Sequence, residues 1–116
     1  MSYAGKELGR RGEAMAAAEL EKNGYQIISR NYRAAGGEID IIVQKADKIY
    51  FVEVKSRRGL KFGLPAEAVT AAKRRKIADT ALAFLAERGE DIVCGFLVAA
   101  VYIDANRVEL IFDALY

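Results

Sequence analysis

Three ionisable side chains interrupt two otherwise apolar segments near the middle of the chain. Asp40 lies within GEIDII, and Glu53 and Lys55 lie within FVEVK. Carboxylates and amines are rare at the centres of β-strands. Two carboxylates beside an amine could bind Mg²⁺ or Mn²⁺ through hard oxygen ligands, while the lysine holds a water molecule or offsets charge on a phosphate.

The spacing of these residues predicts that they meet on one hairpin. The apolar segments flank the polar residues 45–48, which is typical of two antiparallel strands joined by a turn. A loop with an even number of residues pairs Asp40 with Glu53 and Glu38 with Lys55, and all four side chains then share one face of the sheet. Facing carboxylates are destabilising unless a cation compensates them. The alternative interpretation is an exposed, salt-bridged stripe on a one-sided sheet.

Composition limits the chemistry that is available. The chain has 116 residues, of which 53% are hydrophobic, and it contains no histidine. That excludes serine or cysteine nucleophiles activated by histidine, and zinc sites with histidine ligands. The single cysteine, Cys94, lies in the apolar run IVCGFLVAAVYI and is expected to be a buried small hydrophobe. No apolar run approaches the roughly 20 residues of a membrane helix, and the polar amino terminus is unlike a signal peptide, so we predict a cytoplasmic protein without a membrane partner.

Positive charge is concentrated after the candidate metal site. The net charge is only +2, but residues Lys55 to Lys76 include eight basic residues and one acidic residue. Such a concentration indicates a polyanionic partner. The alternative is a solvated loop followed by the start of a helix.

The remaining pattern predicts one α/β domain over residues 1–116, with the order αβββαββ. The expected elements are a helix from about residue 3 to Lys22, a strand Tyr25–Tyr32, the hairpin strands, a helix from Thr70 as N-cap to Arg88, and strands Ile92–Ile103 and Arg107–Phe112. Between the hairpin and the second helix, SRRGLKFGLP predicts a glycine-containing loop that ends in a short helical turn at Pro65.

Glu13 lies on the inward stripe of the first helix. The stripe also contains Gly9, Ala16, Ala17 and Leu20, and it is expected to face the sheet. Gly9 and Gly12 flank Glu13 and permit close approach of a backbone or a phosphate. The alternative is a glutamate at the edge of the helix that reaches solvent.

Together these segments resemble a known family. GEIDII followed by FVEVKSR, behind a helix that contains GRRGEAMAAAEL, resembles the YraN family of small bacterial endonuclease-like proteins. That family is similar to archaeal Holliday-junction resolvases within the PD-(D/E)XK nuclease superfamily. The resemblance extends over nearly the whole chain, through YQIISRNYR, the FG-x-P-x-EAV segment and the helix that includes Lys73.

The resemblance implies a fold, an activity and roles for particular residues. The fold would be a restriction-endonuclease-like mixed sheet flanked by helices, and the activity would be metal-dependent hydrolysis of phosphodiester bonds in DNA, with branched or structured DNA as one candidate substrate. Asp40 and Glu53 would bind Mg²⁺ or Mn²⁺, Glu13 would complete the acidic cluster as a third ligand, and Lys55 would position or activate the attacking water. The basic residues expected to contact nucleic acid are Arg10, Arg11, Arg57, Arg58, Lys73, Arg74 and Lys76.

Two further functions stay open at the level of sequence. One is a nucleic-acid-binding module that keeps the nuclease fold without cleaving, and the other is an interaction domain whose charges are only a solvated surface. The intact set of acids with a lysine favours the nuclease, because a purely binding domain has no need to crowd carboxylates where phosphates dock. The choice between DNA and RNA and the oligomeric state, a homodimer included, are not determined by the sequence.

Overall fold

Helices and strands follow one another in the predicted order αβββαββ in a computed structural model that describes residues 3–58, 71–89 and 93–112. The elements are α1 (Tyr3–Lys22), β1 (Gln26–Ala34), β2 (Gly37–Lys45), β3 (Lys48–Arg57), α2 (Ala71–Arg88), β4 (Val93–Tyr102) and β5 (Arg107–Phe112). The predicted helical turn at Pro65 and the predicted N-cap Thr70 lie outside the described residues.

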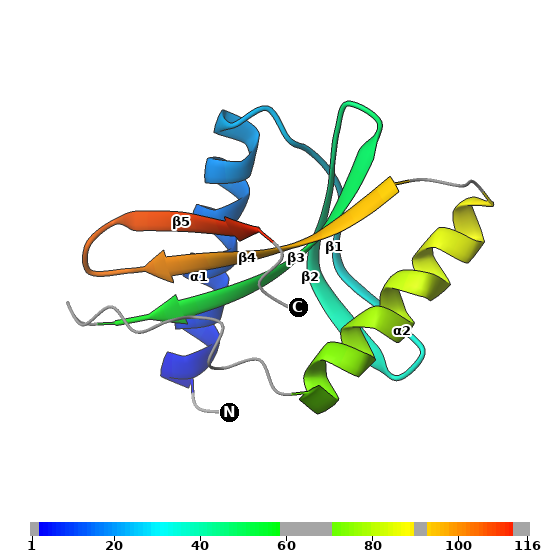
Figure 1. Ribbon diagram of the computed structural model, residues 1–116. Helices are drawn as coiled ribbons and strands as arrows, with labels where there is room; N and C mark the ends of the chain where they lie inside the picture. The colour runs from blue at the N-terminus through cyan, green and yellow to red at the C-terminus, as the bar shows by residue number, and fades with distance from the viewer. Residues whose placement is uncertain (1–2, 59–70, 90–92, 113–116) are drawn as a thin grey trace.

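The strands form one mixed five-stranded sheet in the spatial order β1-β2-β3-β4-β5. Strands β3 and β4 are parallel, and the other neighbours are antiparallel. Two parallel strands need a long crossover connection, and α2 lies in that connection (Figure 1). The predicted mixed sheet flanked by helices is therefore confirmed.

The two helices bury different faces of the sheet. Ala16, Ala17 and Leu20 of α1 pack in one apolar cluster with alternate residues of β2, β3 and β4. Ile77 and Phe84 of α2 pack in a second cluster with the residues that point the other way. Central strands covered on both faces read as continuous apolar runs, as β4 does from Phe96 onward. The inward stripe predicted for α1 is confirmed at Ala16, Ala17 and Leu20, whereas Gly9 is exposed. In α2, Thr80 is fully buried beside the apolar residues.

The turn of the central hairpin has the predicted even length. Ala46 and Asp47 form a two-residue turn between β2 and β3, with a positive φ of 54° at Ala46. The turn pairs Gln44 with Ile49 and continues in the same register to Ile41 with Val52. The register expected from the alternating pattern is confirmed over this stretch.

Each helix approaches the sheet closely at a glycine. A side chain at Gly12 of α1 would overlap Ser56 of β3. A Cβ at Gly37 of β2 would lie 2.5 Å from Thr80 Oγ1 of α2. Thr80 Oγ1 lies 2.9 Å from Ala34 O and also 2.9 Å from Lys76 O, so its hydroxyl can donate to either carbonyl. These contacts fix where both helices lie over β2 and β3, the strands that carry the predicted site.

The prediction that Cys94 is buried is wrong. Its side chain is exposed, because it is the second residue of β4 and precedes the buried stretch that starts at Gly95.

In the part of the chain that the structure describes, neither helix is both long and apolar enough to cross a membrane.

Candidate functional site

Asp40 reaches across from β2 to the backbone of β3. Its Oδ2 accepts a 2.8 Å hydrogen bond from the amide of Val54, just beyond the paired stretch that ends at Ile41 and Val52. On its other side, Asp40 stands between the pairs Arg30–Ile41 and Tyr32–Ile39 of the β1–β2 ladder. The predicted register therefore holds up to Ile41. The next predicted pair, Asp40 with Glu53, is not part of the ladder, and Asp40 instead contacts β3 through its side-chain hydrogen bond to Val54.

Burial and neighbouring carboxylates both raise the pKa of Asp40. Desolvation is the largest influence and repulsion from Glu53 the next, and together with Glu13 and Glu38 they raise the pKa of Asp40 to about 7. The Val54 amide opposes this by stabilising the carboxylate. Burial therefore contributes more than repulsion to the raised pKa of Asp40.

Glu53 is a buried carboxylate paired with a lysine from the opposite layer. Only 7% of the residue is exposed, and its Oε1 lies 2.8 Å from Lys73 Nζ of α2. The other oxygen, Oε2, is buried and has no hydrogen-bond partner among the residues that the structure describes. Such an orphaned acceptor is uncommon in a folded protein and is satisfied when a cation or a water molecule binds it.

Lys55 lies beside both of these groups. Burial lowers the pKa of Lys55, and the hydrogen bond and charge of Lys73 lower it further, against the attraction of Glu53 and Asp40. Burial alone would also lower the pKa of Lys73, but hydrogen bonds to Glu53 and Lys55 outweigh it and the pKa of Lys73 is raised. Of the two lysines, Lys73 therefore keeps its proton more strongly, and Lys55 loses its proton more readily.

Glu13 enters from α1 through a small pocket. The pocket has a volume of about 270 Å³ and is lined by Leu8, Gly9, Glu13, Asp40, Val54, Lys55 and Ser56. Burial raises the pKa of Glu13, followed by repulsion from Glu38, while a hydrogen bond with Asn31 lowers it. Glu13 thus lines the same pocket as Asp40 and Lys55, which agrees with the inward orientation predicted for it.

The donor atoms suit a hard divalent cation only in part. Asp40 and Glu53 offer carboxylate oxygens, which Mg²⁺ and Mn²⁺ prefer, and in the described part of the chain nothing else pairs with Glu53 Oε2. Within the described ranges, no three His, Cys, Asp or Glu side chains are grouped so that they could hold a metal ion. The full predicted set of Glu13, Asp40 and Glu53 is therefore not assembled among the described residues, and metal binding by Asp40 and Glu53 stays a prediction.

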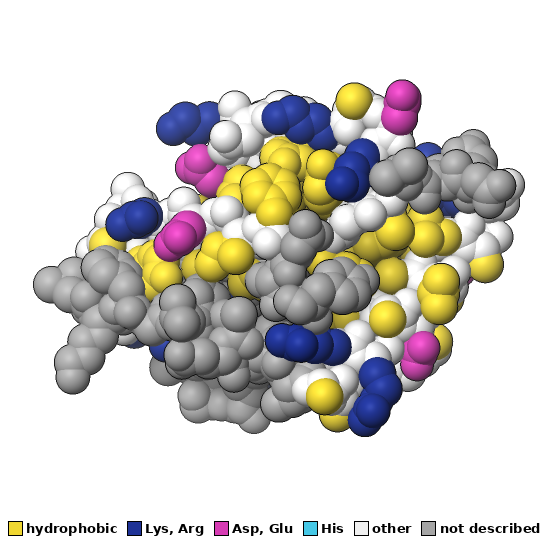
Figure 2. Space-filling view, viewed as in Figure 1, with side chains coloured by type: hydrophobic (Ala, Val, Ile, Leu, Met, Phe, Trp, Pro, Cys, Tyr) yellow, Lys and Arg dark blue, Asp and Glu magenta, His cyan; other side chains and the backbone are white. Residues whose placement is uncertain are grey.

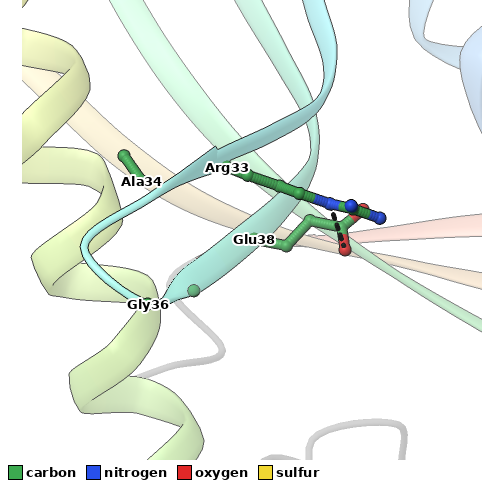
Figure 3. Close-up of a pocket in the computed structure, with 5 residues that line it drawn as sticks. Arg33, Ala34, Gly36 and Glu38 are labelled. Carbon is green, nitrogen blue, oxygen red and sulfur yellow. Dashed lines mark ion pairs between the residues drawn. The ribbon is translucent and has the colours of Figure 1, made fainter.

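Glu38 influences the site through its charge, which raises the pKa of Glu13 and of Asp40, and not as a ladder partner of Lys55. It was expected opposite Lys55, but it forms a 3.5 Å ion pair with Arg33 of β1, which is its neighbour in the β1–β2 ladder. That ion pair borders a larger pocket of about 480 Å³ at the turn between β1 and β2 (Figure 3). The larger pocket is lined by Arg33, Ala34, Gly36, Gly37 and Glu38. Its lining contains one carboxylate, that of Glu38, whereas the lining of the smaller pocket contains both Glu13 and Asp40.

The basic residues predicted to contact nucleic acid have varied surroundings. Arg10 lies 3.9 Å from Glu7, and Arg58 lies 3.5 Å from Asp104. Arg11 and Lys76 are exposed, whereas Arg57 and Arg74 are partly buried. On the face seen in Figure 2, Lys and Arg side chains lie separately around a hydrophobic area instead of forming one basic patch.

Two contacts of the site are not predicted by the sequence. The structure pairs Lys73 with Glu53, in addition to the contact with nucleic acid that stays a prediction for Lys73. Asn31, which interacts with Glu13, was not predicted at all. Asn31 has a positive φ of 52°. An asparagine inside a strand pattern is a sequence signal for such an irregularity, because asparagine adopts the left-handed region more readily than most residues.

Comparison with known proteins places the chain in a family. The model of the uncharacterised protein family UPF0102 matches residues 12–112. A UPF0102 protein of Geobacter sulfurreducens is 46% identical over 97% of this chain and 91% of its own length. Another, of Chlorobium chlorochromatii, is 48% identical over 85% of this chain and 77% of its own length. A third, of Symbiobacterium thermophilum, is 48% identical over 83% of this chain and 82% of its own length. The chain therefore belongs to the UPF0102 family.

Proposed function

We propose that this protein is a metal-dependent endonuclease that hydrolyses phosphodiester bonds in DNA, with branched or structured duplexes as candidate substrates. The observation that carries the proposal is the state of Asp40, whose pKa is raised to about 7 by burial and by Glu53 beside it. Strongly perturbed carboxylates in a pocket are candidates for functional sites. The resemblance of GEIDII and FVEVKSR to the YraN family and to PD-(D/E)XK nucleases supports the same proposal.

Each residue of the site has a role in this proposal. Asp40 and Glu53 would hold Mg²⁺ or Mn²⁺, with Glu13 as a third, more distant carboxylate. A bound divalent ion supplies Lewis-acid stabilisation of charge on the attacked phosphate. Lys55 positions the attacking water, and because burial and Lys73 lower the pKa of Lys55, its amine can also accept a proton from that water.

The test is cleavage by purified protein of labelled branched, flapped and linear DNAs, and of an RNA duplex, with Mg²⁺ or Mn²⁺. We expect Asp40→Ala, Glu53→Ala and Lys55→Ala each to abolish metal-dependent cleavage, because each removes a charged group to which the proposal gives a separate role. Glu109→Ala, which removes an exposed carboxylate of β5, is the control and should keep the wild-type rate. Circular dichroism spectra of all variants verify the fold. Cleavage that survives all three site substitutions would place the activity elsewhere.

A second candidate is a nucleic-acid-binding module that keeps the nuclease fold without cleaving. Two observations favour it: Lys73 already compensates Glu53 at 2.8 Å, and no group of three metal-binding side chains forms among the described residues. In that case the protein should retain the same DNAs in a gel-shift assay, with and without metal, and leave them intact.

A further inference from the structure

Lys73 occupies the place where a cation would be needed. Its ammonium lies 2.8 Å from Glu53 Oε1, and the two side chains are 37% and 8% exposed. Lys73 also interacts with Lys55, so one α2 side chain contacts two residues of the candidate site. This contact joins α2 to β3, two elements that residues 58–70 separate in the chain.

We propose that Lys73 is a built-in counter-ion of Glu53 that competes with the divalent metal, so that loading of the metal displaces the lysine. The inference rests on the proposed function, because it needs Asp40 and Glu53 to be the metal-binding pair. Once displaced, the ammonium of Lys73 becomes available to an oxygen of the substrate phosphate. Lys73 is then a positioning residue, and it links occupancy of the metal site to recognition of nucleic acid.

Electrostatics argue against both cations sharing Glu53. The carboxylate carries one negative charge, and an ammonium on Oε1 with a divalent ion on Oε2 would place three positive charges around it. Asp40 adds at most one negative charge, so the sum of the charges around Glu53 would stay positive. Water screens this repulsion poorly at Glu53, because the carboxylate is almost fully buried. Breaking the ion pair is therefore part of the free-energy cost of metal binding.

Calorimetric titration of Mn²⁺ and Mg²⁺ into the metal-free protein measures this cost without any assay of activity. Lys73→Met keeps a straight apolar stem but removes the competing charge. We expect Lys73→Met to bind Mn²⁺ at least about tenfold more tightly than wild type, which corresponds to the lower end of the contribution of a hydrogen bond to a charged group. Arg75→Met is the matched control, since it removes one positive charge from an exposed residue of the same helix.

A second variant covers the case in which Lys73→Met folds poorly. Lys73→Arg keeps the charge and offers Glu53 a planar, two-pronged donor, so it should compete more strongly and weaken Mn²⁺ binding. Equal Mn²⁺ affinity in Lys73→Met and Arg75→Met, or weaker binding in Lys73→Met, overturns the inference while the proposed nuclease stands. Absence of Mn²⁺ and Mg²⁺ binding in every variant overturns both.

Discussion

Replacing Asp40 with asparagine should stabilise the metal-free protein at neutral and alkaline pH. The asparagine side chain keeps an oxygen that can accept the Val54 amide, and it removes the negative charge beside Glu53. Because the pKa of Asp40 is raised in the folded state, folded protein holds the proton more tightly than unfolded chain. The free energy of unfolding of wild type should therefore fall as the pH rises from about 4 to about 7.

The size of the effect follows from that shift. The pKa rises from 3.8 to about 7, and each unit corresponds to about 1.4 kcal/mol, so ionised Asp40 costs up to about 4 kcal/mol above pH 7. Part of this cost is repulsion between Asp40 and Glu53, which the two carboxylates share. We therefore take about 2 kcal/mol as the lower bound of the cost that Asp40→Asn removes. For a domain of this size such a gain should raise the unfolding midpoint of Asp40→Asn at pH 8 by roughly 8 °C or more.

Urea and thermal unfolding at pH 4, 6 and 8 in the presence of a chelator measure the difference. Asp40→Asn and wild type should converge at pH 4 and diverge progressively above it. Asp79→Asn, a substitution at an exposed aspartate of α2, is the control and should follow wild type throughout. If wild type instead gains stability relative to Asp40→Asn between pH 4 and 7, Asp40 is not a destabilised carboxylate and the central support for the nuclease site is lost.

Two other predictions concern helix docking and nucleic acid. Gly12→Ala should destabilise the protein in urea unfolding, by about 1–3 kcal/mol, because the added methyl overlaps Ser56. Gly9→Ala on the same helix has open space and should gain up to about 1 kcal/mol, so equal effects would contradict the close approach of α1 to β3. Alanine at four basic positions should flatten the dependence of DNA affinity on salt, by about 0.9 in log–log slope for each phosphate that is no longer neutralised, and an unchanged slope would assign these charges to solubility. The four positions are Arg57, Arg58, Lys73 and Lys76.

Patterns of local origin were readable from the sequence alone. The alternation of apolar and polar residues around the turn at Ala46 and Asp47 set the register of β2 and β3, because a shift by one residue would turn every side chain to the wrong face. The inward stripe of α1 followed from the helical period. The order αβββαββ and the candidacy of Asp40, Glu53 and Lys55 rested on these same short-range regularities.

Only the tertiary structure decided which groups from distant elements meet. No periodicity relates Lys73 to Glu53, so their 2.8 Å contact depends on where α2 lies on the sheet. Asp40 belongs to the strand pattern, yet its hydrogen bond to the Val54 amide arises where the two strands cease regular pairing. Cys94 is exposed although its neighbours in sequence are apolar, because burial depends on which part of a strand other elements cover. Short-range patterns determine the elements and their inward faces, whereas the charge state of the site depends on burial and on neighbours that come together only when the chain has folded.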